Sequence, residues 1–438
     1  MLTKLKVKKF KSLYDVEISL KKLNIFIGPN NSGKSSILQV LLFLKQCYEH
    51  KNPKYDHPYN FREFNEVVFD KKVEDIIHIF IEQELTKKLN EKFTTLGYDL
   101  NKIGTDFQIP NNANKLVIDS RLMDEFFESG LILYKNTLPE NHPYFEEIRK
   151  KIDPKLIAGG TSDGDRWLRF SRSIKYHDEA QSHLDQFRVI KALNESIINL
   201  NSFYSNFFKN ITFIPVERGS MKWFTQIVGS TPKEIHTNDK GSTLFNALFH
   251  MIRREHSKTL KRIRKWTKEF GIHDLTPYPV DATEPSCGVE TLQDYSSSPF
   301  QLISMGFGTR QVLFVIVKAL LAKKRSLILI EEPEIHLHPS YQTKIIDFFV
   351  ELINNDDKQV MVTTHSEYLL LRIQNSILRG EIDKESVGIF YIDIKDGKTK
   401  VNELQFTKEG SFEMPGFYDV TQQEYREWLQ LKAKNSDK

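Results

Sequence analysis

One nine-residue segment, GPNNSGKSS at 28–36, constrains the fold of this chain. An apolar run, LNIFI at 23–27, precedes it, and a second apolar stretch, ILQVLLFLK at 37–45, follows it. Short apolar runs are typical of buried strands, longer ones of helices, and glycines mark the turns between them. The pattern predicts a strand, a tight loop and a helix over 37–48, and a flexible turn with a capping glycine is the alternative.

The spacing inside the loop favours phosphate binding. Gly28, Gly33, Lys34 and Ser35 match every specified position of G-x-x-x-x-G-K-[ST]. Glycines let the backbone point a ring of N–H groups at a phosphate, and the positive end of the following helix adds to the attraction. We expect Lys34 to reach the β- and γ-phosphates of ATP and the Ser35 hydroxyl to ligate Mg²⁺. The predicted nucleotide-binding residues of the loop are Gly28, Asn30, Asn31, Ser32, Gly33, Lys34, Ser35 and Ser36.

Composition places the chain among globular proteins of about three domains, since it has 438 residues with 39% hydrophobic and 27% charged side chains. No apolar run approaches the ~20 residues of a membrane span, so we expect no membrane partner. Two cysteines, Cys47 and Cys287, cannot form a disulfide framework, which favours a cytoplasmic location. The net charge of +4 is too small to indicate a nucleic-acid partner by itself.

Strand and helix patterns predict an α/β fold, a mixed or parallel sheet with flanking helices, split by a mainly helical insertion. The predicted strands lie within 2–27, 64–69, 76–82, 211–220, 327–330 and 360–366. A long helical tract is predicted over 242–270 and a loop rich in Pro, Ser and Thr over 276–299. The predicted domains are the N-terminal part of the head at 1–83, the insertion at 84–210, the C-terminal part of the head at 211–386 and a small C-terminal domain at 387–438.

The segment LILIEEPEIHLHP at 327–339 has the Walker B pattern of four apolar residues followed by two carboxylates. We expect Glu331 to face the hydrated Mg²⁺ and Glu332 to polarise the attacking water as a general base. An acidic strand end that caps a helix is the alternative. The first acid is Glu where most P-loop ATPases have Asp, so the metal contact can differ or pass through water.

Two further elements complete the predicted site. Ser304 and Gly306, in SMGFGTRQ, precede an apolar helix, and a helix N-terminus with a serine is an anion site suited to the γ-phosphate of a second subunit's nucleotide. An ordinary glycine-rich turn with a capping residue is the alternative. His365, in VTTHS, follows the strand after Walker B, where it would sense the γ-phosphate or contact the attacking water. A structural histidine is the alternative there. His336 and His338 invite a zinc hypothesis, which we reject because structural zinc usually has four ligands.

In this order, the P-loop, S-x-G-x-G, EEPE-x-HLHP and THS resemble the ABC-type ATPase heads of the RecF/SMC-like and OLD-like families. The resemblance covers about 1–83 and 211–372, and the tail around GIFYIDIKDGKTKVNEL resembles a small C-terminal domain of some bacterial ATPases. Stand-alone heads of this kind resemble the ATPase components of antiphage systems, Septu's PtuA among them. The resemblance implies an ABC-type P-loop ATPase head that forms a homodimer, or a higher even oligomer, with two ATP molecules between P-loops and partner S-x-G-x-G segments. It also implies Glu332 as base and His365 as switch, and Gln83 is a weak candidate for the Q-loop.

OLD-type proteins carry a Toprim nuclease after the head, and the residues after THS are too few for one. Asp393 and Asp396 lie on a predicted hairpin and are explained by turn chemistry. A nuclease would therefore be a separate effector protein. The sequence favours a bacterial antiphage ATPase that controls such an effector or a toxin. A RecF-like DNA-repair ATPase and a nucleotide-locked scaffold that holds an effector inactive are the alternatives.

A basic helix is predicted over 253–270, with eight Lys or Arg and two Glu. A solvated helix face explains this pattern as well as a contact to DNA or RNA phosphates without base specificity does. Trp266 would stack on a base or, more simply, pack in the core, and Arg218 would reach the nucleotide or DNA. The candidate nucleic-acid residues are Arg254, Lys258, Lys261, Arg262 and Lys265.

Overall fold

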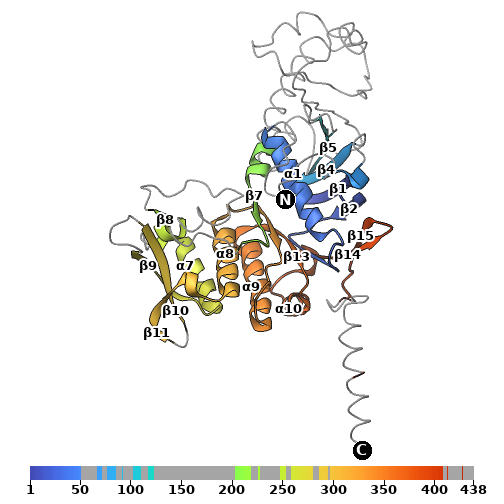
Figure 1. Ribbon diagram of the computed structural model, residues 1–438. Coiled ribbons are helices and arrows are strands. Elements are labelled where there is room, and N and C mark those ends of the chain that lie inside the picture. Colours follow the sequence, from blue (N-terminus) through green and yellow to red (C-terminus); the bar gives the residue numbers. More distant parts are fainter. Residues whose placement is uncertain are drawn as a thin grey trace, which may run out of the picture.

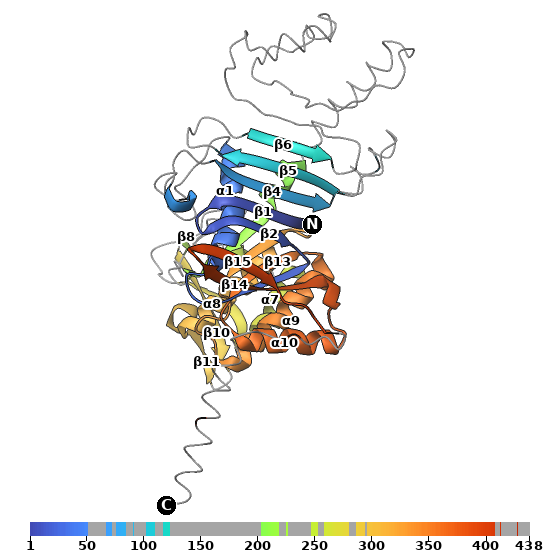
Figure 2. The ribbon, with the colours of Figure 1, turned by 90° about the vertical axis from the view of Figure 1, so that its right-hand side faces the viewer.

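The computed structural model describes 1–50, 67–71, 76–84, 102–109, 117–122, 203–218, 225–226, 247–252, 258–279, 286–293 and 296–407, together with residues 91, 412 and 427. Figures 1 and 2 show these parts in two views related by 90°.

A six-stranded sheet forms the centre of the head, in the order β15-β14-β3-β13-β12-β7. All neighbouring pairs are parallel except β14 and β15, which form an antiparallel hairpin. The mixed, mostly parallel sheet of the predicted α/β fold is therefore present. Because β14 pairs with β3, its residues belong to the head, and the predicted separate domain from residue 387 is wrong for the described part. The strands are β3 (Leu23–Ile27), β7 (Ile211–Ile214), β12 (Leu327–Glu331), β13 (Gln359–Thr364), β14 (Val387–Lys395) and β15 (Lys398–Glu403).

An antiparallel sheet lies beside this core, in the order β2-β1-β4-β5-β6 (Figure 2). The prediction of a helical insertion from residue 84 is wrong for β5 and β6, which continue the sheet of β1, β2 and β4. Of the predicted strand at 64–69 the structure describes residues 67–69. There Val68 forms an isolated bridge with Phe10, and the 3₁₀ turn Phe69–Lys71 follows, so the strand prediction is wrong for these residues. Apart from residue 91, the rest of the predicted insertion up to residue 202 lies outside the described residues. The strands are β1 (Leu2–Phe10), β2 (Leu13–Ser19), β4 (Ile77–Glu84), β5 (Lys102–Ile109) and β6 (Val117–Leu122).

A third sheet occupies the segment predicted as a loop over 276–299. Strands β9 and β11 flank β10 in antiparallel pairing, and β8 also pairs with β10. The serines, threonines and prolines there suggested a loop. Serine and threonine nevertheless fit a strand when a partner strand forms the hydrogen bonds of its backbone N–H and C=O groups. The strands are β8 (Thr225–Gln226), β9 (His273–Pro279), β10 (Ser286–Gln293) and β11 (Ser296–Gln301).

Two apolar cores cover the two faces of the central sheet. Ile328 and Ile330 of β12 face the core built with α7 to α10, whereas Leu327 and Leu329 face the core shared with α1 and the antiparallel sheet. This period of two is what a strand buried on both faces requires. In Figure 1, α8, α9 and α10 lie side by side under the sheet. The helices are α1 (Lys34–His50), α7 (Lys258–Glu269), α8 (Phe307–Leu321), α9 (Pro339–Asp356) and α10 (Glu367–Leu378), with 3₁₀ turns at Leu302–Ser304 and Lys384–Ser386.

The basic helix α7 packs against α9. Leu260, Ile263 and Trp266 are buried, and the Trp266 ring lies 5.2 Å from that of Phe348. Trp266 therefore packs in the core and does not present its face to a nucleic-acid base.

Ion pairs hold the same two helices together. The Arg262 guanidinium donates to Glu351 at 3.0 Å and to Asp356 at 2.8 Å, and the Lys265 ammonium contacts Glu351 at 2.5 Å. These two cations therefore have carboxylate partners within the fold. Their contact with nucleic-acid phosphates stays a prediction. Lys258 and Lys261 are exposed, and Arg254 lies outside the described residues.

We predict that Arg262→Ala lowers the free energy of unfolding by about 2 kcal/mol, because it removes charged hydrogen bonds to two largely buried carboxylates. Lys261→Ala, on the exposed face of the same helix, should change it by less than about 0.5 kcal/mol. Urea unfolding followed by tryptophan fluorescence measures both. Equal, small effects of the two substitutions would contradict a structural role for Arg262.

Candidate functional site

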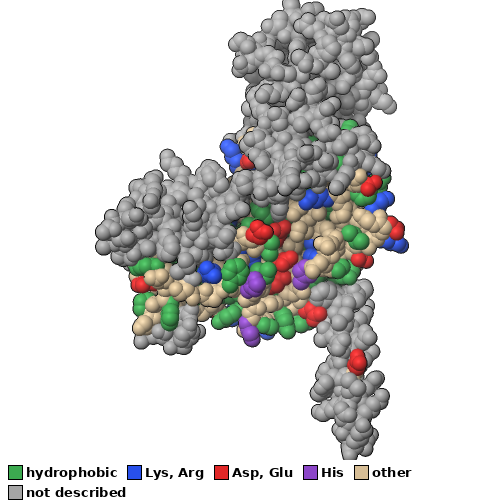
Figure 3. Space-filling view, in the orientation of Figure 1, with side chains coloured by type: hydrophobic (Ala, Val, Ile, Leu, Met, Phe, Trp, Pro, Cys, Tyr) green, Lys and Arg blue, Asp and Glu red, His purple; other side chains and the backbone are tan. Residues whose placement is uncertain are grey.

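The predicted site residues meet at the carboxyl edge of the central sheet. There the P-loop follows the end of β3, His365 follows the end of β13, and β12 ends at Glu331. The parallel register places Ile27 opposite Thr364 and Glu331 opposite Thr363. Polar side chains that follow neighbouring parallel strands must lie at one edge, so the P-loop, Walker B and His365 are brought together. Figure 3 shows acidic and histidine side chains gathered in the middle of the described face.

The P-loop has the predicted strand, turn and helix, with Lys34 as the first residue of α1. Gly33 has a φ of 101°, and a Cβ there would lie 2.3 Å from the Thr399 hydroxyl. At Gly28 a Cβ would lie 2.0 Å from the carbonyl oxygen of Ile392. Both glycines are therefore required by the close approach of the β14–β15 hairpin as well as by the loop's backbone conformation.

Thr399 of β15 ties this hairpin to the loop. Its buried hydroxyl donates to the Ser32 carbonyl at 2.9 Å and lies 2.7 Å from the Ser12 hydroxyl. Its backbone N–H donates to the Ser12 carbonyl at 2.8 Å. Sequence analysis missed Thr399, because the hydrogen bond joins positions 367 residues apart.

Lys34 is buried and turned toward its own loop. Its ammonium donates to the carbonyls of Gly28 at 2.9 Å and Pro29 at 2.7 Å. Burial lowers the pKa of Lys34, and the nearby carboxylates of Glu332 and Glu334 oppose that shift. The buried Ser32 hydroxyl has no hydrogen-bond partner among the described residues. The loop thus holds a buried cation and an unpaired hydroxyl at the place where the motif binds phosphate.

Walker B is held by a buried arginine. The Arg218 guanidinium donates to the backbone carbonyls of Pro215 and Glu331, both at 2.8 Å, and of Glu332 at 2.7 Å. Arg218 is 1% exposed, and its desolvation lowers its pKa to about 10, so it stays charged at neutral pH. The Glu331 carboxylate accepts from the N–H of Val216 at 3.3 Å. Arg218 therefore fixes the end of β12, and the hypothesis that it reaches a nucleotide or DNA is wrong.

Glu332 and His365 face each other across the strand ends, with 3.7 Å between a Glu332 carboxylate oxygen and Nε2 of His365. Glu332 has a φ of 41°, the left-handed conformation in which the Arg218 contact holds its carbonyl. Burial and then the positive charge of Lys34 lower the pKa of His365, against the opposing effect of Glu332. His365 is therefore neutral at physiological pH.

A third carboxylate, that of Glu334, holds His365 and the preceding residue, Thr364, in place. Its Oε1 accepts from the Thr364 hydroxyl at 2.6 Å and from the His365 N–H at 2.8 Å. Burial raises the pKa of Glu334, and these hydrogen bonds oppose the shift. Its Oε2 is buried without a partner among the described residues. The third acid of EEPE was the available signal for this residue, and sequence analysis did not assign it a role.

The signature-like segment lies at the start of α8. Gly306 is the N-cap of that helix, Ser304 ends the preceding 3₁₀ turn, and both are exposed. No hydrogen bond among the described residues joins them to the P-loop. The next glycine, Gly308, would place a Cβ 2.2 Å from the carbonyl oxygen of His336. The helix start therefore packs on the loop after Walker B and leaves Ser304 and Gly306 accessible.

The two histidines of HLH have local partners. Nδ1 of His338 lies 2.8 Å from the Ser340 hydroxyl and accepts from the Ser340 N–H, which caps α9. The His336 ring packs edge-on against Phe307 at 4.9 Å. Among the described residues no group of three metal-ligating side chains occurs.

Gln83, the Q-loop candidate, lies at the wrong edge of the head. Gln83 lies opposite Leu2 in the pairing of β4 with β1. The Leu2 N–H donates a hydrogen bond to the side chain of Gln359, at the amino end of β13. His365 follows the other end of that strand, about 20 Å away at ~3.3 Å per residue. The Q-loop prediction is wrong because β4 runs in a separate antiparallel sheet, whose strand ends do not share the edge of the parallel strands.

This constellation defines an ABC/SMC-like P-loop ATPase head, in which a phosphate loop, Walker B carboxylates and a histidine converge at one edge of an α/β sheet. The profile of the AAA ATPase domain family matches residues 1–370, through the insertion as well as the head, and the chain belongs to this family.

Known proteins with similar sequence or shape include RecF and SMC heads. The DNA replication and repair protein RecF of Colwellia psychrerythraea is 40% identical over 175 residues, which is 40% of this chain and 41% of RecF. The chain thus spans about two-fifths of that relative's length. The SMC head bound to the C-winged helix domain of ScpA aligns over 93% of this chain and 98% of its own, with 13% identity and a TM-score of 0.48. The SMC head domain from Thermotoga maritima aligns over 92% and 99%, with 10% identity and a TM-score of 0.41.

Within the described part of the chain, the helices are too short or too polar to cross a membrane.

We predict that Thr399→Val raises the Kd for ATP about 3–10-fold, because the hairpin loses its hydrogen bond to the phosphate loop while the side-chain volume is kept. Isothermal titration with a slowly hydrolysed ATP analogue measures this constant. Thr343→Val is the matched control, since that exposed hydroxyl donates to the Ser340 carbonyl on α9. An unchanged Kd for Thr399→Val would show that the hairpin does not order the loop.

Proposed function

We propose that the chain hydrolyses ATP to ADP and phosphate, and that ATP binding joins two heads into a dimer that controls a separate effector. The observation that carries this proposal is the convergence of Lys34, Glu332 and His365, with 3.7 Å between the last two.

The loop suits the triphosphate and its metal ion. The unpaired Ser32 hydroxyl and the inward-turned Lys34 ammonium offer a donor and a cation, so they fit a phosphate group. Ser35 in the first turn of α1 and Glu331 at the end of β12 would hold Mg²⁺. Bound there, Mg²⁺ would neutralise charge on the β- and γ-phosphates.

Glu332 is the proposed general base. It takes a proton from water as the water oxygen attacks the γ-phosphorus, and the bond to the β–γ bridging oxygen breaks to release ADP. Neutral His365 donates or accepts a hydrogen bond without adding charge, which suits a switch that contacts the γ-phosphate or the water. Glu334 keeps the His365 backbone in place.

The dimer is proposed from the exposed signature-like segment. Ser304 and Gly306 have no bond to the P-loop within the described part of the chain, and exposed N–H groups at the start of α8 can bind a phosphate. A second copy of the chain would place this segment over the nucleotide of the first copy. Each composite site then uses the P-loop of one chain and the α8 start of the other.

In the biological setting we favour, this cytoplasmic ATPase acts in antiphage defence and gates a nuclease or toxin encoded separately, as the resemblance to PtuA-like heads suggests. The RecF match favours a second function, DNA repair without a nuclease. A nucleotide-locked scaffold is the third. A nuclease gene beside this gene would favour defence, and a repair operon would favour the RecF-like function.

We predict that Glu332→Gln retains ATP binding but loses at least about 100-fold in turnover, because shape remains while the base is removed. Lys34→Ala should instead abolish or nearly abolish binding. Titration with ATP and a phosphate-release assay separate the two effects. Wild-type turnover by Glu332→Gln would show that another group is the base.

We predict complementation between Lys34→Ala and Ser304→Arg subunits. In a mixed dimer one composite site carries both defects and the other carries neither, so ATPase activity should partly return on mixing. Analytical ultracentrifugation must show that mixed dimers form. Co-assembled mutants that stay inactive would indicate a site built within one chain.

A further inference from the structure

A cavity of about 630 Å³ lies at the edge of the head opposite the P-loop. Gln83 of β4, Leu327 at the start of β12 and Gln359 at the start of β13 line it. Volumes of ~300–1,000 Å³ are typical of small-molecule sites. The nucleotide site lies at the carboxyl ends of the same parallel strands, so this cavity is a separate place on the molecule.

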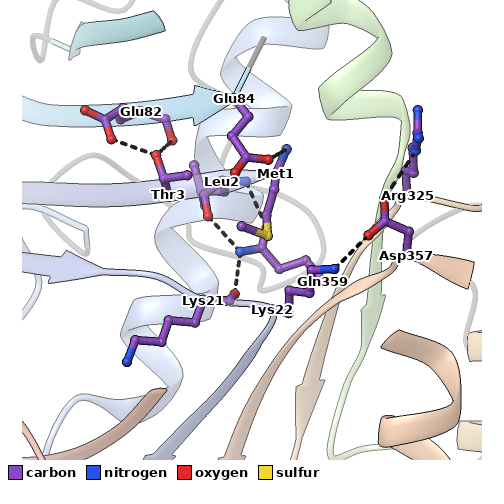
Figure 4. A network of polar contacts seen from close by, with 10 residues as sticks. All are labelled: Met1, Leu2, Thr3, Lys21, Lys22, Glu82, Glu84, Arg325, Asp357 and Gln359. Atoms are coloured by element: carbon purple, nitrogen blue, oxygen red, sulfur yellow. Dashed lines mark hydrogen bonds and ion pairs between the residues drawn. The ribbon is translucent and has the colours of Figure 1, made fainter. Parts of the chain in front are cut away.

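Two glutamines line the cavity and differ in their hydrogen bonds. Gln359 is fully used: it donates to the carbonyls of Leu2 and Lys21, both at 2.7 Å, and accepts from the Leu2 N–H at 2.9 Å (Figure 4). Gln83 is only 2% exposed, yet neither its side-chain nitrogen nor its oxygen has a partner within the described residues. A buried, unpaired carboxamide is costly, and such a group is explained when a ligand supplies the missing partners.

Residues 203–210, just before β7, add a hydrogen-bond acceptor and an aromatic surface to the cavity. Asn210 donates to Asn206 at 3.1 Å, and the Asn210 side-chain oxygen is buried without a partner in the described part of the chain. Residues 203–209 form a helix just before β7. Phe203 and Phe207 line the same cavity from this helix, and their spacing of four residues places them on one side of it.

Among the side chains that line the cavity, three are basic, Lys22, Lys324 and Arg325, and two are acidic, Glu84 and Asp357. Lys22 and Arg325 share one carboxylate, that of Asp357, at 3.2 and 3.3 Å, as Figure 4 shows. Lys324 also lines the cavity and donates to a backbone carbonyl at 3.4 Å. The other acid of the lining, Glu84, lies 3.7 Å from the terminal amine of Met1. The Arg325 side chain is 82% exposed, so its guanidinium is available to an anion.

We propose that this cavity binds an adenine mononucleotide, independently of ATP hydrolysis at the P-loop. An adenine edge offers an amino group with two hydrogens beside a ring nitrogen that accepts. Gln83 complements this edge as donor and acceptor, the pairing that glutamine makes with adenine elsewhere, and the Asn210 oxygen accepts the second amino hydrogen. Phe203 and Phe207 supply an apolar surface for the base. Lys324 and Arg325 meet the phosphate, for which arginine has a matching planar fork.

The test is isothermal titration of the full-length Lys34→Ala protein with AMP, because that variant lacks the main phosphate cation of the P-loop. We expect one AMP per chain, with adenosine and inorganic phosphate binding at least about 10-fold more weakly. GMP should also bind more weakly, since guanine has a carbonyl where adenine has the amino group.

Two further substitutions in that background locate the site. Gln83→Met keeps the side-chain length but not the carboxamide, so AMP binding should fall at least about 10-fold while the unliganded protein melts at a higher temperature. Arg325→Glu should weaken AMP binding and leave adenosine binding unchanged. Arg379→Glu, a comparably exposed charge reversal on the end of α10, is the matched control and should change neither.

Absence of AMP binding would overturn the proposal, and so would AMP binding that both Gln83→Met and Arg325→Glu leave unchanged. If Gln83→Met fails to fold, the exposed Arg325→Glu substitution decides alone. ATPase activity of Gln83→Met with Lys34 intact should stay at the wild-type rate. Failure at this cavity is therefore distinguishable from failure of the proposed hydrolysis site.

Discussion

The parallel pairing of β3, β13, β12 and β7 is the constraint on which the rest of the head depends. Its register sets Ile27 beside Thr364, Thr363 beside Glu331 and Ile330 beside Ile214. Residues that follow four strands from distant parts of the chain therefore meet at one edge. The same pairing explains why the charge of Lys34 helps to lower the pKa of His365, which lies more than 300 positions away in the sequence.

Charge balance at that edge is maintained by two buried cations. Glu331, Glu332 and Glu334 lie within four positions of one another, and Arg218 and Lys34 oppose their negative charge. Arg218 uses its hydrogen bonds on backbone carbonyls, so it stabilises the shape of the strand end as well as its charge. Lys34 is bound only to carbonyls of its own loop among the described residues, which leaves it able to exchange those contacts for phosphate oxygens.

The parts of the site that were predictable from the sequence are those set by local spacing. Short sequence patterns of a few residues were enough to predict three features. These are the glycines and Lys34 of the P-loop, the apolar strand before Glu331 and the strand before His365. What the sequence could not show depends on distant partners. The two carboxylates that bind Arg262 lie 89 and 94 positions away from it. The strands β9 to β11 are rich in Ser, Thr and Pro, so the β-propensity of their residues does not explain them. They are strands because β9 and β11 both pair with β10.

The solvent exposure of the three acids supports Glu332 as the proposed base, whereas their spacing in the sequence does not distinguish them. Glu331 is 5% exposed, and its carboxylate accepts a hydrogen bond from the backbone N–H of Val216. Glu334 is 8% exposed and is held by Thr364 and the His365 N–H. The Glu332 side chain is 32% exposed and faces His365. A base must reach a water molecule that enters from solvent, and Glu332 alone of the three combines this access with a neutral histidine beside it.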